Sequence, residues 1–143
     1  EDRIRSLLSR SRIEIKNKIA VVVIDKHIFT DDLLELERRI KKSRNVFYAI
    51  EGTDAITIIT AAAFLDDIHS SFKSSIVKVC ADLALVVIAS PEEIEETPGV
   101  FSYLSALLSD KGINILETMS CWSETLFVVA EADIAKVLEA LRF

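Results

Sequence analysis

Two kinds of hydrophobic pattern alternate along the chain, one typical of strands and one typical of helices. Arg12 to Asn17 alternates polar and apolar residues, which favours a half-buried strand, and Lys18 to Asp25 is a β-branched run typical of a central strand. Residues 30–42 then place leucine and isoleucine at helical spacing, with aspartates in the first turn and lysines in the last. We therefore expect two strands and then a helix, which Thr30 caps.

The pattern continues with a hairpin and a second helix. Residues 45–52 and 54–60 favour two strands around a tight turn. Residues 61–72 place phenylalanine, leucine and isoleucine on one helical face. From Lys18 onward, the predicted order up to this point is strand, helix, strand, strand, helix.

The apolar segment 76–90 is longer than a typical strand. Its least apolar point is Asp82, so we predict two strands, Ile76–Cys80 and Leu83–Ala89. From the second of these onward the chain repeats the order strand, helix, strand, strand, helix. The last helix has an apolar stripe made of Ile134, Val137, Leu138 and Leu141.

The two halves of the chain also match in content. Val21 to Ile24 corresponds to Leu85 to Ile88 at an offset of 64, and Ile56 to Ile59 corresponds to Leu126 to Val129 at an offset of 70. An internal duplication explains both matches. Each copy would be a βαββαβ unit, with a four-stranded antiparallel sheet and two helices on one face, so we predict an α+β chain of two ferredoxin-like units.

The second unit lacks its last strand, because the chain ends in a helix at Phe143, whereas the first unit has a spare strand ahead of its own first strand. We expect residues 12–17 to cross over and complete the second sheet, which would interlock the units. The predicted organisation is a linker or short helix at 1–11, a first unit at 18–80, and a second unit made of 12–17 and 83–143.

Composition narrows the class of protein. The chain has 143 residues, 50% of them hydrophobic, and its apolar runs stay far below the roughly 20 residues that a membrane helix needs. The net charge of −6 argues against a nucleic-acid surface, because neutralising phosphates requires clustered Lys and Arg. The sequence begins at Glu1 rather than Met, which is typical of a segment of a longer protein. We expect a cytoplasmic protein that contacts neither membranes nor nucleic acid.

No catalytic or metal-binding pattern stands out. His27 and His69 have no partner at ligand spacing, and the sequence contains no Ser-His-Asp order and no phosphate loop. Cys80 and Cys121 fit neither a disulfide framework nor a zinc site, so we expect both to be buried free thiols in a reducing compartment. The sequence therefore predicts a protein that is not an enzyme and that has no cofactor and no metal.

The stretch TPGVFSYLSALLSDKGINI concentrates proline and glycine in a chain with only two prolines and three glycines. Thr97 is expected to cap a helix, Pro98 to occupy its first position and Gly112 to end it. Gly99 has no such role, since glycine in a helical turn is destabilising by roughly 0.5–1 kcal/mol relative to alanine. Either it forms a tight turn, or it lets a carboxylate approach the free N–H groups of the helix N-terminus. The acidic loop PEEIEET just before this stretch is typical of a solvated surface, with the cover of a pocket as the alternative.

From Thr97 to Phe143 the sequence resembles an ACT domain, a regulatory module whose pattern is Pro-Gly, a helix, Gly-Ile-Asn-Ile and a following hairpin. The resemblance is closest to the tandem ACT pair at the C-terminus of aspartate kinases, which place a Ser-Glu ahead of the second hairpin strand, as Ser123 and Glu124 do here. IVKVCADLALVVIAS is similar to the connector within that pair, and RIEIKN followed by KIAVVVID is similar to its opening strands. The resemblance covers residues 12–143, and no segment resembles the kinase catalytic domain.

Modules of this family bind amino acids or similar small molecules between paired domains, and the bound effector alters an attached enzyme or DNA-binding domain. By resemblance, the ligand-binding residues lie at the loop-to-helix junction, in the Gly-Ile-Asn-Ile segment and in the hairpin, namely Gly99, Val100, Phe101, Asn114, Ile115, Ser123, Glu124 and Thr125. The first unit departs from the pattern, because its loop DKHIFTDD has no proline or glycine and RNVFYA lacks the Gly-Ile-Asn run. We expect the first unit to pair and support rather than to bind.

The leading hypothesis is a non-catalytic tandem ACT module that binds an amino acid or similar small effector and couples it to homodimerisation or to an attached domain. The alternative is a ligand-free assembly domain of a larger regulator or enzyme. Gly99 and Asn114 discriminate between the two, because only the first hypothesis needs a ligand against them.

Overall fold

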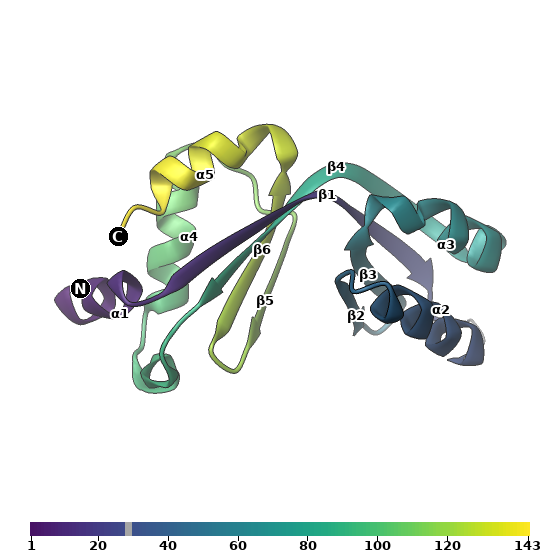
Figure 1. Ribbon diagram of the computed structural model, residues 1–143, viewed down its shortest axis with the longest axis horizontal. Helices are drawn as coiled ribbons and strands as arrows, with labels where there is room; N and C mark the ends of the chain where they lie inside the picture. Colours follow the sequence, from purple (N-terminus) through teal and green to yellow (C-terminus); the bar gives the residue numbers. More distant parts are fainter. Residues whose placement is uncertain (28–29) are drawn as a thin grey trace. The chain divides into compact units, whose positions relative to one another are not determined.

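The computed structural model describes residues 1–27 and 30–143, and Figure 1 shows its helices and strands. Ile28 and Phe29, in the loop DKHIFTDD, lie outside the described residues, as does the side chain of Thr30 that was expected to cap a helix. The strands are β1 (Arg12–Asp25), β2 (Phe47–Glu51), β3 (Ala55–Ala61), β4 (Ile76–Ala89), β5 (Glu117–Cys121) and β6 (Glu124–Ala130). The α-helices are α1 (Asp2–Ser9), α2 (Thr30–Lys42), α3 (Leu65–Phe72), α4 (Val100–Asp110) and α5 (Ile134–Ala140). Short 3-10 helices are η1 (Ala62–Phe64), η2 (Lys73–Ser75), η3 (Glu92–Glu96) and η4 (Glu131–Asp133).

The chain divides into two compact units, one of which is made of two separate segments. Unit 1 contains residues 1–17 and 84–143, and unit 2 contains residues 18–83. β1 and β4 each pass through both units, and the strand order is β2-β3-β1-β4-β6-β5. Unit 2 is therefore built on β2-β3-β1-β4 and unit 1 on β1-β4-β6-β5, which is the strand order of a ferredoxin-like sheet in both cases. The predicted α+β fold of two ferredoxin-like units is confirmed.

At two places where the sequence predicted a boundary between strands, the structure has a bend within one continuous strand. The hydrophobic pattern predicted two strands in each region, but β1 and β4 each run for 14 residues without a break. Lys18 and Asp82 have a left-handed backbone, with φ of 53° and 56°. A single left-handed residue turns a strand locally without ending it, and for a residue other than glycine this costs about 1–2 kcal/mol. Lys18 and Asp82 are separated by the repeat offset of 64, so the two strands bend at equivalent positions.

In unit 2, α2 and α3 cover one face of the sheet. β3 pairs antiparallel with β1, which places Val22 opposite Ile58, and with β2, which places Tyr48 opposite Ile59. Alternate side chains of each strand point to the helices, where they meet the apolar stripes of α2 and α3. The buried core of this unit consists of Val22, Ile24, Leu36, Ile40, Phe47, Ile56, Ile58, Ile68 and Phe72.

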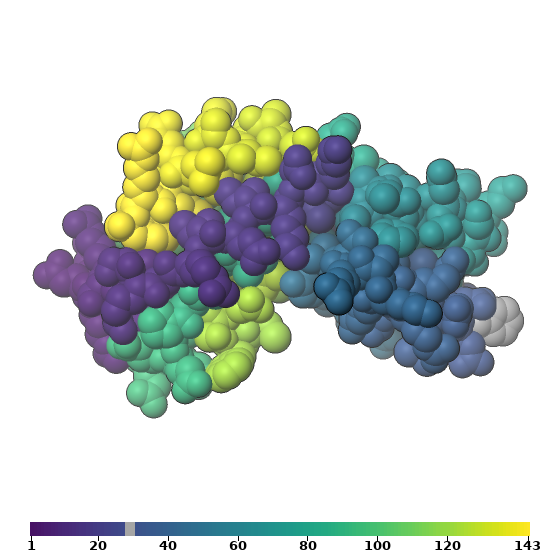
Figure 2. Space-filling view, viewed as in Figure 1, coloured from purple at the N-terminus to yellow at the C-terminus, as the bar shows by residue number. Residues whose placement is uncertain are grey.

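In unit 1, the N-terminal helix α1 joins α4 and α5 in one core. Leu7 and Leu8 of α1 are 1% and 0% exposed, and β5 pairs antiparallel with β6. Figure 2 shows the purple N-terminal segment against the yellow C-terminal segment of the same unit. The buried core consists of Leu7, Leu8, Ala84, Val86, Ile88, Val100, Leu104, Leu108, Ile113, Phe127, Val129, Val137 and Leu141.

The two units repeat the same order of elements, but one predicted offset is wrong by a residue. β2 and β5 are 70 positions apart, whereas β3 and β6, which have the same length, are 69 positions apart. The difference lies in the hairpin turn, which spans residues 52–54 in unit 2 and residues 122–123 in unit 1. Ile58 therefore corresponds to Phe127 rather than to Val128. The side chains of Ile58 and Phe127 are both fully buried.

One predicted core position in the last helix is also wrong. Leu138 is 55% exposed, whereas Val137 and Leu141 are 0% and 4% exposed. Val137 and Leu141 share a face because they are four residues apart, and Leu138 is turned about 100° away from Val137 toward solvent. No helix within residues 1–27 and 30–143 is long and apolar enough to cross a membrane.

Candidate functional site

The N-terminus of α4 is formed by a glycine in the left-handed region. Gly99 is the N-cap residue, with φ of 86°, and no side chain caps the helix. A Cβ added at Gly99 would lie 3.5 Å from Cδ1 of Ile4, so the backbone conformation rather than lack of space favours glycine here. The first N–H groups of a helix have no intrahelical partner and carry partial positive charge. Without a side-chain cap, those of α4 are available to an anion.

Thr97 and Pro98 lie before the helix, not in the capping and first positions that the sequence predicted. Thr97 follows η3, and its Oγ1 donates to the carbonyl of Glu93 at 2.7 Å. Because Gly99 takes the N-cap position, the helix begins only at Val100.

The C-terminus of α4 is closed by glycine, as the sequence predicted. Gly112 has φ of 72°, and its N–H donates to the Ser109 carbonyl at 2.9 Å. The N–H of Ile113 donates to the Leu108 carbonyl at 3.1 Å, and these two side chains belong to one core. Together these features form a Schellman motif, which fixes how the chain leaves α4 toward β5.

A cavity of about 240 Å³ opens beside the N-terminus of α4, within unit 1. Its walls are η3 with the loop that follows, the first turn of α4, and the β5–β6 hairpin. The lining residues are Ile94, Glu95, Thr97, Gly99, Val100, Phe101, Ser120, Trp122, Glu124 and Thr125. Five of the eight predicted ligand-binding residues are among them, namely Gly99, Val100, Phe101, Glu124 and Thr125. The fold thus brings the loop-to-helix junction and the hairpin to one hollow.

The other three predicted residues lie elsewhere. Asn114 is exposed, and Ile115 is partly buried and packs against the core of unit 1. The carbonyl of Ser123 accepts a hydrogen bond from the N–H of Ser90 at 2.9 Å, which ties the hairpin turn to the end of β4. A ligand role for Asn114, Ile115 and Ser123 stays a prediction from the resemblance.

Two aromatic side chains line the cavity, and the sequence identified Phe101 but not Trp122. Trp122 is 69% exposed and sits at the hairpin turn with φ of 52°. Phe101 is 45% exposed, and its ring stacks on that of the buried Phe127 with 5.9 Å between centroids. The signal that could have found Trp122 is its place beside the Ser-Glu pair of the hairpin.

The charged side chains that line the cavity are acidic. Glu95 and Glu124 line it, and its described lining includes no Lys, Arg or His. Glu95 comes from the acidic loop, for which the sequence favoured a solvated surface. The cavity therefore combines free N–H donors and the positive end of the α4 dipole with carboxylates on η3 and β6. This arrangement suits a small molecule that carries both an anionic and a cationic group.

Other reactive groups are dispersed. Within the described residues, no group of three or more His, Cys, Asp or Glu side chains could hold a metal ion. Cys80 and Cys121 are free thiols, but Cys121 is exposed and Cys80 only partly buried, so the prediction that both are buried is wrong. Cys121 ends β5, an edge strand of the sheet, where it pairs with Glu124 of β6 on one side.

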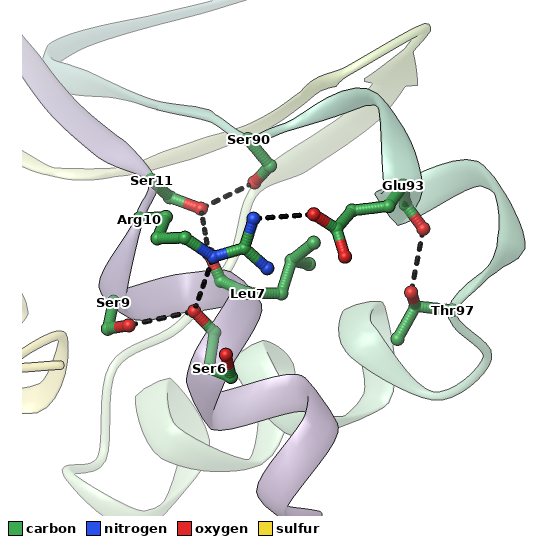
Figure 3. A network of polar contacts seen from close by, with 8 residues as sticks. All are labelled: Ser6, Leu7, Ser9, Arg10, Ser11, Ser90, Glu93 and Thr97. Carbon is green, nitrogen blue, oxygen red and sulfur yellow. Dashed lines mark hydrogen bonds and ion pairs between the residues drawn. The ribbon is translucent and has the colours of Figure 1, made fainter.

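The acidic loop that walls the cavity is bonded to α1 (Figure 3). The guanidinium of Arg10 forms an ion pair with the carboxylate of Glu93, whose own carbonyl accepts the hydrogen bond from Thr97. The hydroxyls of Ser11 and Ser90 lie 2.9 Å apart. The hydrogen bond between the two side chains lowers the pKa of Glu93 and raises the pKa of Arg10. The loop from Ser90 to Thr97 therefore contacts α1 on one side and the cavity on the other.

No protein-family model and no curated protein matches the chain, but solved structures do. The aspartate kinase of Clostridium acetobutylicum gives a TM-score of 0.73 at 18% identity, over 90% of this chain and 33% of the kinase chain. The regulatory subunit of aspartate kinase from Thermus thermophilus, in its ligand-free form, gives 0.67 at 12% identity, over 90% of this chain and 92% of that chain. E. coli aspartokinase III in complex with lysine and aspartate gives 0.65 at 12% identity, over 90% of this chain and 31% of that chain.

These likenesses establish the fold. The chain has the fold of the regulatory domains of aspartate kinases, as the resemblance of its sequence predicted. It spans about a third of the length of the Clostridium kinase and nearly all of the Thermus regulatory subunit.

Proposed function

We propose that this chain is a non-catalytic regulatory module that binds an amino acid or a similar small effector in the cavity beside Gly99. The observation that carries the proposal is the cavity itself, where an uncapped helix N-terminus and two carboxylates face one space. The fold supports it, because a regulatory subunit of aspartate kinase shares that fold and E. coli aspartokinase III forms a complex with lysine and aspartate.

An α-amino acid matches the charges of the cavity. Its carboxylate fits the N–H groups of the first turn of α4, and its ammonium fits the carboxylates of Glu95 and Glu124. Because the described residues that line the cavity include acidic side chains but no basic ones, effectors with a neutral or basic side chain are favoured over aspartate and glutamate. The volume of about 240 Å³ lies below the roughly 300–1,000 Å³ of sites for drug-sized ligands, which suits a molecule of amino-acid size.

The bound effector is proposed to act on homodimerisation or on an attached domain, in the cytoplasm. Ser120 of β5 lines the cavity, and β5 is an edge strand of the kind that a second copy can pair with. A second copy at β5 would adjoin the cavity, so binding and association would be coupled.

The second candidate is a ligand-free assembly domain. It is favoured by exposed apolar side chains on β4, where Val77 and Val79 are 67% and 46% exposed. Neighbouring apolar side chains at a surface are typical of a contact with another protein.

A thermal-shift screen against the twenty standard amino acids at millimolar concentration tests the proposal. We expect stabilisation by at least one amino acid with a neutral or basic side chain, of about 2.7 kcal/mol at 100 times its dissociation constant. Gly99→Asp should abolish the shift, because its carboxylate would occupy the N-terminus of α4. Gly112→Asp is the matched control, since it adds the same group at a similar φ, with nothing within 4 Å, at the other end of the same helix.

The possible results separate the two candidates. No shift with any amino acid would favour the assembly domain. A shift that survives Gly99→Asp would place the binding site elsewhere. Light scattering should find the same oligomeric state in the Gly99→Asp variant and the unchanged protein, which separates loss of binding from loss of assembly.

A further inference from the structure

Arginines of the N-terminal segment hold the acidic loop at two points. The guanidinium of Arg3 donates to the carbonyl of Glu96 at 3.5 Å, and Arg10 forms the ion pair with Glu93. The two arginines are seven residues apart, or about two helical turns, so they lie on the same side of α1. Helix α1 and its C-cap residue Arg10 therefore contact the acidic loop at two separate points.

Residues of the same loop form a wall of the cavity. Ile94, Glu95 and Thr97 line it, whereas Glu93 and Glu96 of the same loop contact the two arginines. Glu93 serves both sides, because its carboxylate pairs with Arg10 while its carbonyl accepts the hydrogen bond from Thr97. A displacement of Glu93 would thus move Thr97, which is 6% exposed and lines the cavity.

The position of Arg10 is itself fixed by α1. Its Nε donates to the carbonyl of Ser6 at 3.3 Å, so the side chain is braced against the last turn of the helix (Figure 3). Leu7 and Leu8 anchor that turn in the core of unit 1. Ile4, one turn earlier, packs against the same core and lies beside Gly99. The contacts that hold α1 in place therefore also hold the wall of the cavity in place.

We propose that Arg10 is a positioning residue of the candidate effector site, and that docking of α1 and binding of the effector are coupled through Glu93 and Thr97. Coupling between two equilibria is reciprocal, so an effector that needs the ordered wall stabilises docked α1 by the same factor by which docking raises its affinity. The coupling rests on the proposed function, but the positioning role of Arg10 can be measured without any effector.

The proposal is tested with the variant Arg10→Gln. Amide hydrogen exchange of the whole chain is measured for this variant and for the unchanged protein, with and without each of the twenty standard amino acids. We expect the amides of residues 93–97 and 99 to exchange about two- to five-fold faster. The affinity for any stabilising amino acid should fall about two- to five-fold, which is the range of an exposed ion pair. Arg38→Gln is the matched control, because Arg38 forms an exposed ion pair with Glu35 on α2 in unit 2. The double exchange Arg10→Glu with Glu93→Arg should restore both protection and affinity.

Three results are decisive. Unchanged exchange of residues 93–99 in Arg10→Gln would overturn the positioning role, whether or not an amino acid binds. Faster exchange with unchanged affinity would overturn the coupling to the site. If no amino acid protects the unchanged protein, the proposed function fails, while the exchange of residues 93–99 still decides the role of Arg10.

Discussion

The first long helix of each unit ends with the same pair of backbone hydrogen bonds, but on different residues. In unit 1 the left-handed position is Gly112, with φ of 72°, and in unit 2 it is Arg44, with φ of 64°. The N–H of Arg44 donates to the Lys41 carbonyl at 3.0 Å, and the next N–H donates to the Ile40 carbonyl at 3.4 Å. The repeat thus keeps its backbone geometry where the glycine is missing. At the other end of the helix the units differ in what surrounds it: the cavity of unit 1 is lined by Gly99 and the β5–β6 hairpin, whereas a hollow beside the start of α2 in unit 2 is lined by His27, Asp32 and residues 70–75.

The largest effects on stability are expected at a pair of equivalent core residues, one in each unit. Phe127→Ala should lower the free energy of unfolding by about 3–5 kcal/mol and Ile58→Ala by about 2–5 kcal/mol, because both side chains are fully buried. Only Phe127 supports the cavity, since Phe101 stacks on it. Urea denaturation measures the stabilities, and calorimetric titration measures the binding of the amino acids that stabilise the unchanged protein. Equal loss of binding in both variants would contradict a special role of Phe127 in supporting the cavity.

A smaller effect, of opposite sign in the two units, is expected at the helix ends. Gly112→Ala should destabilise by about 1 kcal/mol, because alanine is strained at φ of 72°. Arg44→Gly should stabilise by about 0.5–1 kcal/mol, because it removes the strain that arginine has at φ of 64° but adds freedom to the unfolded chain. Thermal unfolding of both variants measures the difference. A destabilised Arg44→Gly would mean that the arginine side chain contributes more than its backbone strain costs.

The smallest effect on stability is expected from the ion pair between Arg10 and Glu93, which lies in the acidic loop that precedes α4. Hydrogen bonding to Arg10, with a weaker attraction from Arg3, holds the pKa of Glu93 below its ordinary value of 4.5. The contribution of this ion pair is therefore fully present above pH 4.5 and is lost as the pH falls through the lower pKa of the folded state. In Arg10→Gln, nuclear magnetic resonance titration of the Glu93 carboxyl carbon should show its pKa rise toward 4.5. Glu139, whose pKa is lowered by Lys111, is the internal control and should not change.

Most of the fold could be predicted because hydrophobic periodicity and the duplication both report on burial. The bends at Lys18 and Asp82 could not, because a left-handed residue inside a strand leaves the apolar pattern on both sides intact. The offset of 70 was wrong for a related reason. β3 and β6 are apolar on both faces near Ile58 and Phe127, so composition alone does not show which residues face the helices.

The site could be predicted in part, and the limit is again physical. Pro98 and Gly99 mark the junction, and the resemblance to a known pattern indicated the hairpin. Trp122 and Glu95 were missed because their place in the cavity depends on how η3 and the hairpin pack beside α4, which no local pattern encodes. For the same reason, the sequence contained no sign that Arg10 contacts Glu93, which is 83 positions away.

The passage of β1 and β4 through both units has a consequence for how the chain is made. Unit 2 is a continuous segment, residues 18–83, so all its strands can pair as soon as that segment has left the ribosome. The sheet of unit 1 also needs residues 84–143, which leave the ribosome later. Folding of unit 2 brings the two ends of its own segment into adjacent strands, which shortens the loop that unit 1 must close. We therefore expect unit 2 to fold first and to assist the closure of unit 1, which carries the proposed site.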